Sequence, residues 1–168
     1  MITADAELPG ADRQHIRGDE EISAAAQDLL TRARHRLEIF APRIEVQTFN
    51  DPSTTDVLNH FASSHQRNRG QFVITDETWF FRFNPRLVDL CRRLNTFYEV
   101  RRLNTDYPFD NECFIIVDRE SVFHQPKLTT PVAVVSIENR SYARHFARKF
   151  ERYWQAAESL QELFTIGL

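Results

Sequence analysis

Residues 111–125 read Asn-Glu-Cys-Phe-Ile-Ile-Val-Asp-Arg-Glu-Ser-Val-Phe-His-Gln, and this stretch predicts the centre of the fold. Residues 114–117 are an unbroken run of aromatic and β-branched side chains, which is typical of a strand buried on both faces. The polar residues 118–121 favour a turn, and Val122 and Phe123 begin a return strand. We therefore expect a β-hairpin whose first strand lies in the middle of the core.

The same stretch resembles the motif of the phospholipase D superfamily, His-x-Lys-x-x-x-x-Asp at the end of a buried strand that a hairpin follows. Aligned on Asp118, the histidine position holds Asn111 and the lysine position holds Cys113. The superfamily's Gly-Ser-x-Asn sequence falls at residues 125–128, which read Gln-Pro-Lys-Leu. The order of predicted strands and helices follows the superfamily over residues 12–160. The chain looks most like small, uncharacterised bacterial domains that carry one degenerate motif.

The chemistry of the two replaced positions implies a loss of catalysis. In active relatives the histidine attacks phosphorus, the lysine holds phosphate oxygens and the aspartate orients groups of the site. The amide of Asn111 has no lone pair basic enough for that attack. Cys113 cannot supply a fixed positive charge. The resemblance therefore implies a non-catalytic domain with a binding, regulatory or structural role.

A second interpretation is an enzyme with an altered site, either a nuclease-like phosphodiesterase or another hydrolase. Its candidate residues are Cys113, Asp118 and the nearby His124. A reactive thiol needs a base or a positive field beside it, and the local sequence offers none except His124 across the turn. A buried, structural Cys113 is the favoured alternative.

A third interpretation is the binding of a phosphate-containing or nucleic-acid ligand by the Arg-rich segment 82–102. The net charge of −3 implies no general affinity for nucleic acid, but the charge is unevenly distributed. Residues 1–31 hold seven acidic and two Arg side chains, whereas residues 80–102 hold six Arg and two acidic side chains. The candidate ligand-binding residues are Arg92, Arg93, Arg101 and Arg102. A genomic codon bias towards Arg together with a solvated helix face is the favoured explanation of these charges.

Length and composition predict one domain. A chain of 168 residues buries enough surface to fold without a disulfide or a metal. We expect a disordered leader at residues 1–11 and a single phospholipase D-like domain at 12–168. The chain shows no signal peptide and no apolar run long enough to span a membrane, so we expect a cytoplasmic protein. His60 and His65 are five residues apart, which is unlike a metal-ligand spacing, and we expect neither a metal nor another cofactor.

Hydrophobic periodicity predicts an α/β fold, in which helices flank a mixed β-sheet as a phospholipase D-like layer sandwich. We expect helices from Asp19, Ser53, Pro85 and Asn139, and an extended piece or loop at 44–49. Residues 79–83 read as an aromatic connector, and Asp76 as a helix or turn cap. The strands are expected at residues 14–17, 37–41, 71–75, 98–103, 114–117 and 131–137, with a return strand that begins at 122–123 and a linker at 125–130.

Two further expectations concern the motif. In the superfamily an active site needs two motifs that face each other, and this chain carries one. A homodimer would bring Asn111 and Cys113 of two copies together near a two-fold axis. We expect the Asp118 side chain to accept hydrogen bonds from the backbone N–H groups of Glu120 and Ser121, as acids in turns commonly do.

Overall fold

The computed structural model describes residues 13–160, and the predicted leader at 1–11 and the chain after residue 160 lie outside the described part. Within that part, eight strands form one mixed sheet in the order β1-β7-β6-β5-β2-β3-β4-β8. Strands β2, β3 and β4 run parallel to one another, and every other pair of neighbouring strands in this sheet is antiparallel. The strands are β1 (Arg13–Arg17), β2 (Arg36–Phe40), β3 (Arg69–Ile74), β4 (Tyr98–Arg102), β5 (Cys113–Val117), β6 (Ser121–Gln125), β7 (Val132–Ser136) and β8 (Glu158–Ser159). The predicted α/β class with a mixed sheet is confirmed.

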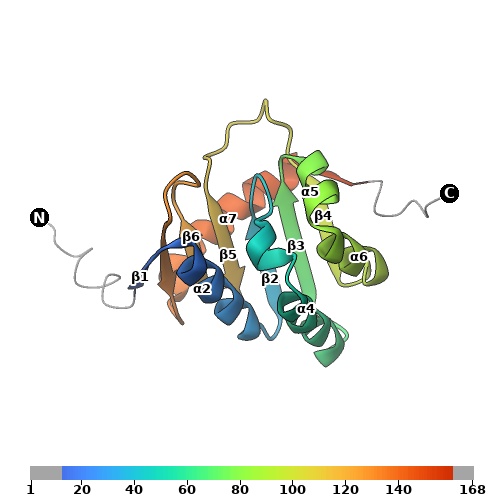
Figure 1. The fold of residues 1–168 in the computed structure, drawn as a ribbon, viewed down its shortest axis with the longest axis horizontal. Helices are drawn as coiled ribbons and strands as arrows, with labels where there is room; N and C mark the ends of the chain where they lie inside the picture. Colours follow the sequence, from blue (N-terminus) through green and yellow to red (C-terminus); the bar gives the residue numbers. More distant parts are fainter. Residues whose placement is uncertain (1–12, 161–168) are drawn as a thin grey trace, which may run out of the picture.

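Helices cover both faces of this sheet (Figure 1). Helices α2, α4, α5 and α6 lie on one face, and α7 crosses the other face behind the sheet in this view. The helices are α2 (Asp19–Thr31), α3 (Val46–Phe49), α4 (Pro52–Ser64), α5 (Glu77–Phe83), α6 (Pro85–Arg93) and α7 (Arg140–Ala156). The described part contains no helix that is both long and apolar enough to cross a membrane.

Strand β5 lies in the middle of the core, as the sequence predicts. Each of its five residues is at most 9% exposed. Ile115 faces the helices of the α2 side, whereas Phe114 and Ile116 face α7. Apolar residues four apart along α7 share one face, and this face packs on β5. There the ring of Phe114 lies 5.3 Å from that of Phe146.

Three local predictions are wrong, and capping explains two of them. Helix α4 starts at Pro52 and not at Ser53, because the Asp51 carboxylate accepts the Ser53 N–H at 2.9 Å and proline suits the first helical position. Residues 79–83 belong to helix α5 and not to a connector. Its N-cap is Asp76, whose carboxylate accepts the Trp79 N–H at 2.9 Å, which confirms the predicted capping role. The segment 44–49 is not extended, since its last four residues form α3.

Candidate functional site

A pocket of about 560 Å³ lies beyond the carboxyl ends of the parallel strands. Strands β2, β3 and β4 all end at this edge, and the loop from β4 to β5 projects above it (Figure 1). The edges of α/β sheets where parallel strands end are the usual place for ligand sites. The lining residues are Pro42, Arg43, Thr75, Asp76, Glu77, Thr78, Arg102, Thr105, Phe109, Asn111, Leu128 and Thr129. We call it the Asn111 pocket.

The charged side chains of the Asn111 pocket form two ion pairs. Arg43 Nε lies 2.9 Å from Asp76 Oδ2, and Arg102 Nε lies 3.2 Å from Glu77 Oε1. The four side chains are between 30% and 63% exposed, so solvent screens both pairs. The pocket therefore carries as many negative as positive groups, and neither Arg is an uncompensated cation.

The two positions that the sequence aligns with the superfamily's histidine and lysine differ in their surroundings. Asn111 is exposed and lines the pocket, whereas Cys113 is 9% exposed and packs into the core on the α2 side. Burial raises the pKa of the Cys113 thiol to about 12, and the nearby carboxylates of Glu112 and Glu45 raise it further. A thiol with this pKa is protonated at neutral pH, so Cys113 lacks the thiolate that nucleophilic attack requires.

The structure does not bring Cys113, His124 and Asp118 together. Residues 113 and 124 lie in adjacent strands, but the Cys113 side chain faces α2 and the His124 ring faces α7, where it lies 4.7 Å from the Phe146 ring. Asp118 follows the opposite end of β5 from Cys113. The three candidate residues of the enzyme interpretation therefore do not form one site.

Asp118 has a different role from the one expected. Its carboxylate does not bind the backbone of Glu120 and Ser121; Oδ1 accepts the N–H groups of His35 and Arg36 at 2.8 Å, and Oδ2 accepts that of Arg34 at 3.0 Å. The expectation fails because Asp118 has a positive φ of 54°, in a tight turn closed by the Glu120 N–H donating to the Val117 carbonyl. Asp118 therefore joins the hairpin to the start of β2.

An ionic cluster that the sequence did not predict lies on the α7 side of the motif strand. Glu112 is 4% exposed, and its Oε1 lies 2.7 Å from His124 Nε2. Lys149 of α7 forms ion pairs with Glu112 and, at 2.6 Å, with Asp110. Glu112 is visible in the sequence between Asn111 and Cys113, but the partner on α7 is 37 residues away and carries no local signal. The cluster ties α7 to the segment that leads into β5.

The Arg-rich segment 82–102 does not form one basic patch. Arg93 pairs with Asp89 on α6, at 2.9 Å. Arg101 and Arg102 point to opposite faces of β4: the Arg101 guanidinium lies 4.0 Å from the centre of the Trp154 ring, whereas Arg102 enters the Asn111 pocket. Arg92 is exposed near the end of α6. Of the four predicted ligand-binding residues, the structure places Arg102 at the pocket and the others elsewhere.

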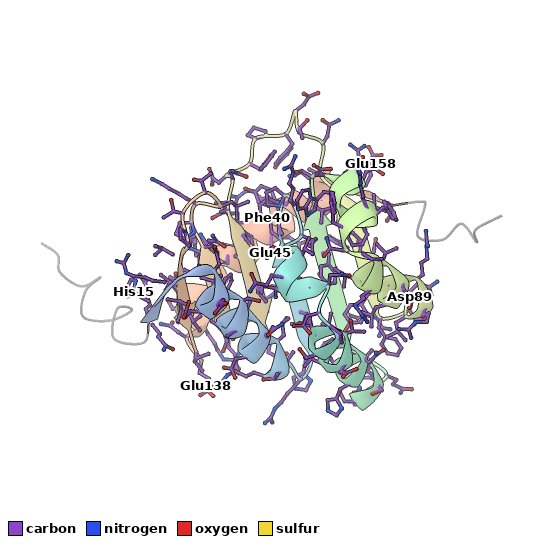
Figure 2. All side chains as sticks on the ribbon, viewed as in Figure 1. His15, Phe40, Glu45, Asp89, Glu138 and Glu158 are labelled. Carbon is purple, nitrogen blue, oxygen red and sulfur yellow. The ribbon has the colours of Figure 1, made fainter. Side chains whose placement is uncertain are left out.

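A second cleft, of about 940 Å³, lies at the other end of the sheet. Figure 2 shows Glu138, which lines this cleft, at the lower edge of the molecule, away from Phe40 at the end of β2. His35, His60 and His65 also line the cleft. Among residues 13–160 no group of three or more His, Cys, Asp or Glu side chains has an arrangement suited to a metal ion.

Comparison with solved structures supports the phospholipase D fold. Nuc from Salmonella typhimurium, a phospholipase D family member, superposes with a TM-score of 0.66 at 14% identity, over 88% of this chain and 97% of its own. NucT from Helicobacter pylori gives 0.59 at 13%, over 88% and 98%. The archaeal chromatin protein TrmBL2, whose structure shows a novel mode of DNA binding, gives 0.66 at 18% identity over 94% of this chain but only 57% of its own length.

These low identities show a shared fold and not a shared activity. No protein in the comparison with curated sequences matches the chain. A family model does match, over residues 18–165, and its range includes all the helices described above and the strands from β2 onward. The chain therefore belongs to the family described as "Domain of unknown function (DUF7931)".

Proposed function

We propose that this chain is a non-catalytic domain that uses the phospholipase D fold to bind a small polar ligand of no net charge in the Asn111 pocket. One observation carries the proposal: the pocket is open, while the positions for a nucleophile and a cation hold Asn111 and a buried Cys113. A volume of about 560 Å³ lies in the range of small-molecule sites.

The charges of the pocket support a neutral or zwitterionic ligand. A phosphate group would have to take Arg43 from Asp76 or Arg102 from Glu77, and would then lie beside the carboxylate it displaced. That arrangement replaces an attraction with a repulsion between like charges. The uncharged side chains of the wall suit a ligand with hydroxyl, amide or amino groups, because Thr hydroxyls and the Asn111 amide both donate and accept hydrogen bonds.

The binding proposal is tested with a thermal-shift screen of hexoses, free amino acids and inorganic phosphate. We expect a sugar or an amino acid to raise the melting temperature of the wild type but not of Asn111→Leu, which blocks the pocket with an apolar side chain. Asn95→Leu is the matched control, because Asn95 is an exposed residue after α6 and lies outside the pocket lining. Stabilisation by phosphate alone, lost in Asn111→Leu, would contradict the neutral-ligand proposal.

The absence of catalysis is tested separately, with bis(4-nitrophenyl) phosphate as a generic phosphodiester substrate. We expect no hydrolysis above the buffer rate. A rate that disappears in Asn111→Ala, but persists in Asn95→Ala, would show that an altered active site works in this pocket.

We also propose that the chain forms a homodimer. The support is that Asn111 and the partly buried Phe109 and Leu128 line a pocket that opens to the surface. Light scattering at increasing protein concentration measures the mass of the particle. A monomer at all concentrations would remove the proposal of a site shared between two copies.

A further inference from the structure

The outer face of α7 carries four arginines at a regular spacing. Arg140, Arg144, Arg148 and Arg152 follow one another every four residues, and all four are exposed. Residues four apart lie one above the other on a helix, with a rise of about 6 Å per step. The four side chains therefore form a continuous stripe about 18 Å long, which we call the α7 stripe.

Three members of the α7 stripe have no acidic partner among the described residues. Arg140 pairs with Glu120 at 3.0 Å, but within residues 13–160 no carboxylate forms an ion pair with Arg144, Arg148 or Arg152. The nearby Glu151 accepts a hydrogen bond from Gln155 at 2.9 Å. On two other helices, by contrast, an Arg pairs with an Asp four residues earlier: Arg32 with Asp28, and Arg93 with Asp89.

The stripe is unfavourable for the helix that carries it. Like charges four residues apart repel each other, and α7 contains three such pairs in succession. Arg140 also lies in the first turn, where the helix dipole disfavours a cation. The packing of α7 gains nothing from these residues, since the helix buries its opposite face against the sheet. Repelling charges of which three form no ion pair within residues 13–160 are best explained by a partner that neutralises them.

We propose that the α7 stripe binds the phosphate backbone of double-stranded DNA. A row of Arg side chains on a rigid helix can follow successive phosphates along one strand of a rigid duplex, and each guanidinium fork suits phosphate oxygens. Contacts to phosphates carry no sequence information, so binding is independent of base sequence.

Two other polyanions fit the surface less well. Single-stranded nucleic acid is commonly bound by exposed aromatic side chains on which bases stack, but Phe146, Phe150 and Trp154 of α7 are buried in the core. A membrane-surface helix inserts its apolar face into the lipid, and the apolar face of α7 is already packed on the sheet.

The negative net charge of the chain does not oppose this surface directly. Segment 140–156 contains five Arg or Lys residues and one acid. The acidic first turn of α2, with Asp19, Glu20 and Glu21, lies on the opposite face of the sheet. The α7 stripe and the helices beside the Asn111 pocket lie on different faces of the sheet. The test of DNA binding is therefore independent of the proposed small-molecule function.

The test measures the binding of a fluorescently labelled DNA duplex of random sequence by anisotropy, at increasing salt concentration. Neutralising three to four phosphates predicts a slope of log K against log salt of about −3. The triple variant R144Q/R148Q/R152Q should bind at least about tenfold more weakly at low salt. Its affinity should also lose most of its dependence on salt concentration. The control R67Q/R82Q/R86Q changes the net charge equally at three exposed arginines away from α7, and should lose much less.

Equal weakening in the two triple variants would overturn the proposal, because it would show a non-specific effect of net charge. So would unchanged binding in R144Q/R148Q/R152Q. Binding of a labelled single strand that exceeds duplex binding, or binding of phosphatidylserine vesicles without duplex binding, would assign the stripe to another partner. Circular dichroism and melting curves of all variants establish that each one is folded.

Discussion

Arg119 holds both carboxylate oxygens of Glu38, with Nε 2.8 Å from Oε1 and Nη2 2.7 Å from Oε2. The Glu38 side chain is fully buried in β2, whereas Arg119 lies in the turn after β5 and has a φ of 58°. The hydrogen bonds to Glu38 raise the pKa of Arg119 above its usual value, although partial burial opposes this. A left-handed backbone is unusual for Arg, and the ion pair holds it there.

The first prediction follows from this pair. Arg119→Met should destabilise the protein by about 2–4 kcal/mol, because it leaves the buried Glu38 carboxylate with a weaker pair, Arg36 at 3.5 Å. The free energy of unfolding in urea measures the loss. Arg140→Met is the control, since the Arg140–Glu120 pair is exposed and should contribute no more than about 1 kcal/mol. Equal losses of unfolding free energy in the two variants would show that the burial of Glu38 does not determine the contribution of the Arg119 pair.

The second prediction concerns the acid stability that Glu112 provides. Burial raises the pKa of its carboxyl, but hydrogen bonds with His124 and Lys149 outweigh this and hold the pKa below the usual 4.5. A carboxyl whose pKa is lowered by folding stabilises the protein fully above the unfolded-state pKa, and this contribution is lost as the pH falls through the folded-state pKa. Urea unfolding between neutral pH and pH values below 4.5 should therefore show a steeper loss for the wild type than for Glu112→Gln.

Lys149 predicts the pH dependence of stability on the alkaline side. Burial lowers the pKa of its ammonium group, but bonds to Asp110 and Glu112 outweigh this and raise the pKa above 10.5. Its contribution is present below pH 10.5 and is lost as the pH rises through the folded-state pKa. Lys149→Met should cost about 3 kcal/mol at neutral pH, and less in the Glu112→Gln background, because the buried charge is then absent. Additive losses would mean that the two residues are not coupled.

The third prediction concerns the cysteines. Burial raises the pKa of Cys91 to about 12, and it is the main cause of the same shift in Cys113. At pH 8 both thiols should react with Ellman's reagent far more slowly than free cysteine, and at the free rate in denaturant. A Cys91→Ala variant isolates Cys113. Fast labelling of Cys113 in the folded protein would restore the enzyme interpretation that the geometry disfavours.

The sequence predicts those parts of the fold that depend on local patterns. The apolar run of β5, the four-residue spacing of Phe146, Phe150 and Trp154, and the Asp76 cap each carry their signal within a few residues. The predicted start of α4 is wrong because Asp51 and Ser53 both suit an N-cap. Which of them caps the helix depends on Pro52, which suits the first helical position. Helix α5 was missed because its seven residues include four aromatic ones, which favour strands in isolation.

The site depends on contacts between distant residues, and the sequence predicts less of it. Asn111 was identified by its spacing from Asp118, and it does line a pocket. The pairs Arg119–Glu38 and Lys149–Glu112 join residues 81 and 37 positions apart, so no local pattern reveals them. The Arg-rich segment 82–102 was misleading because residues adjacent in a strand point to opposite faces, which separates Arg101 from Arg102.

The last prediction concerns Asp118, whose carboxylate accepts three consecutive backbone N–H groups at the start of β2. If Asp118 accepted hydrogen bonds only within its own turn, Asp118→Asn would leave the stability nearly unchanged. The hydrogen bonds observed lead to a different expectation. Asn keeps one oxygen, so its amide N–H group would face the N–H of Arg34 or His35, and we expect a cost of about 1 kcal/mol. Asp118→Ala removes all three bonds and should cost about 2–3 kcal/mol.

Urea unfolding of the wild type and both variants tests this order. Asp106→Ala, an exposed acid in the loop before β5, is the control and should lie within about 0.5 kcal/mol of the wild type. Loss of amide-exchange protection at Arg34, His35 and Arg36 in Asp118→Ala would locate the effect at the predicted donors. If Asp118→Asn were instead neutral and those amides stayed protected, the carboxylate would not be what holds the hairpin to β2, and the retained acid would need another explanation.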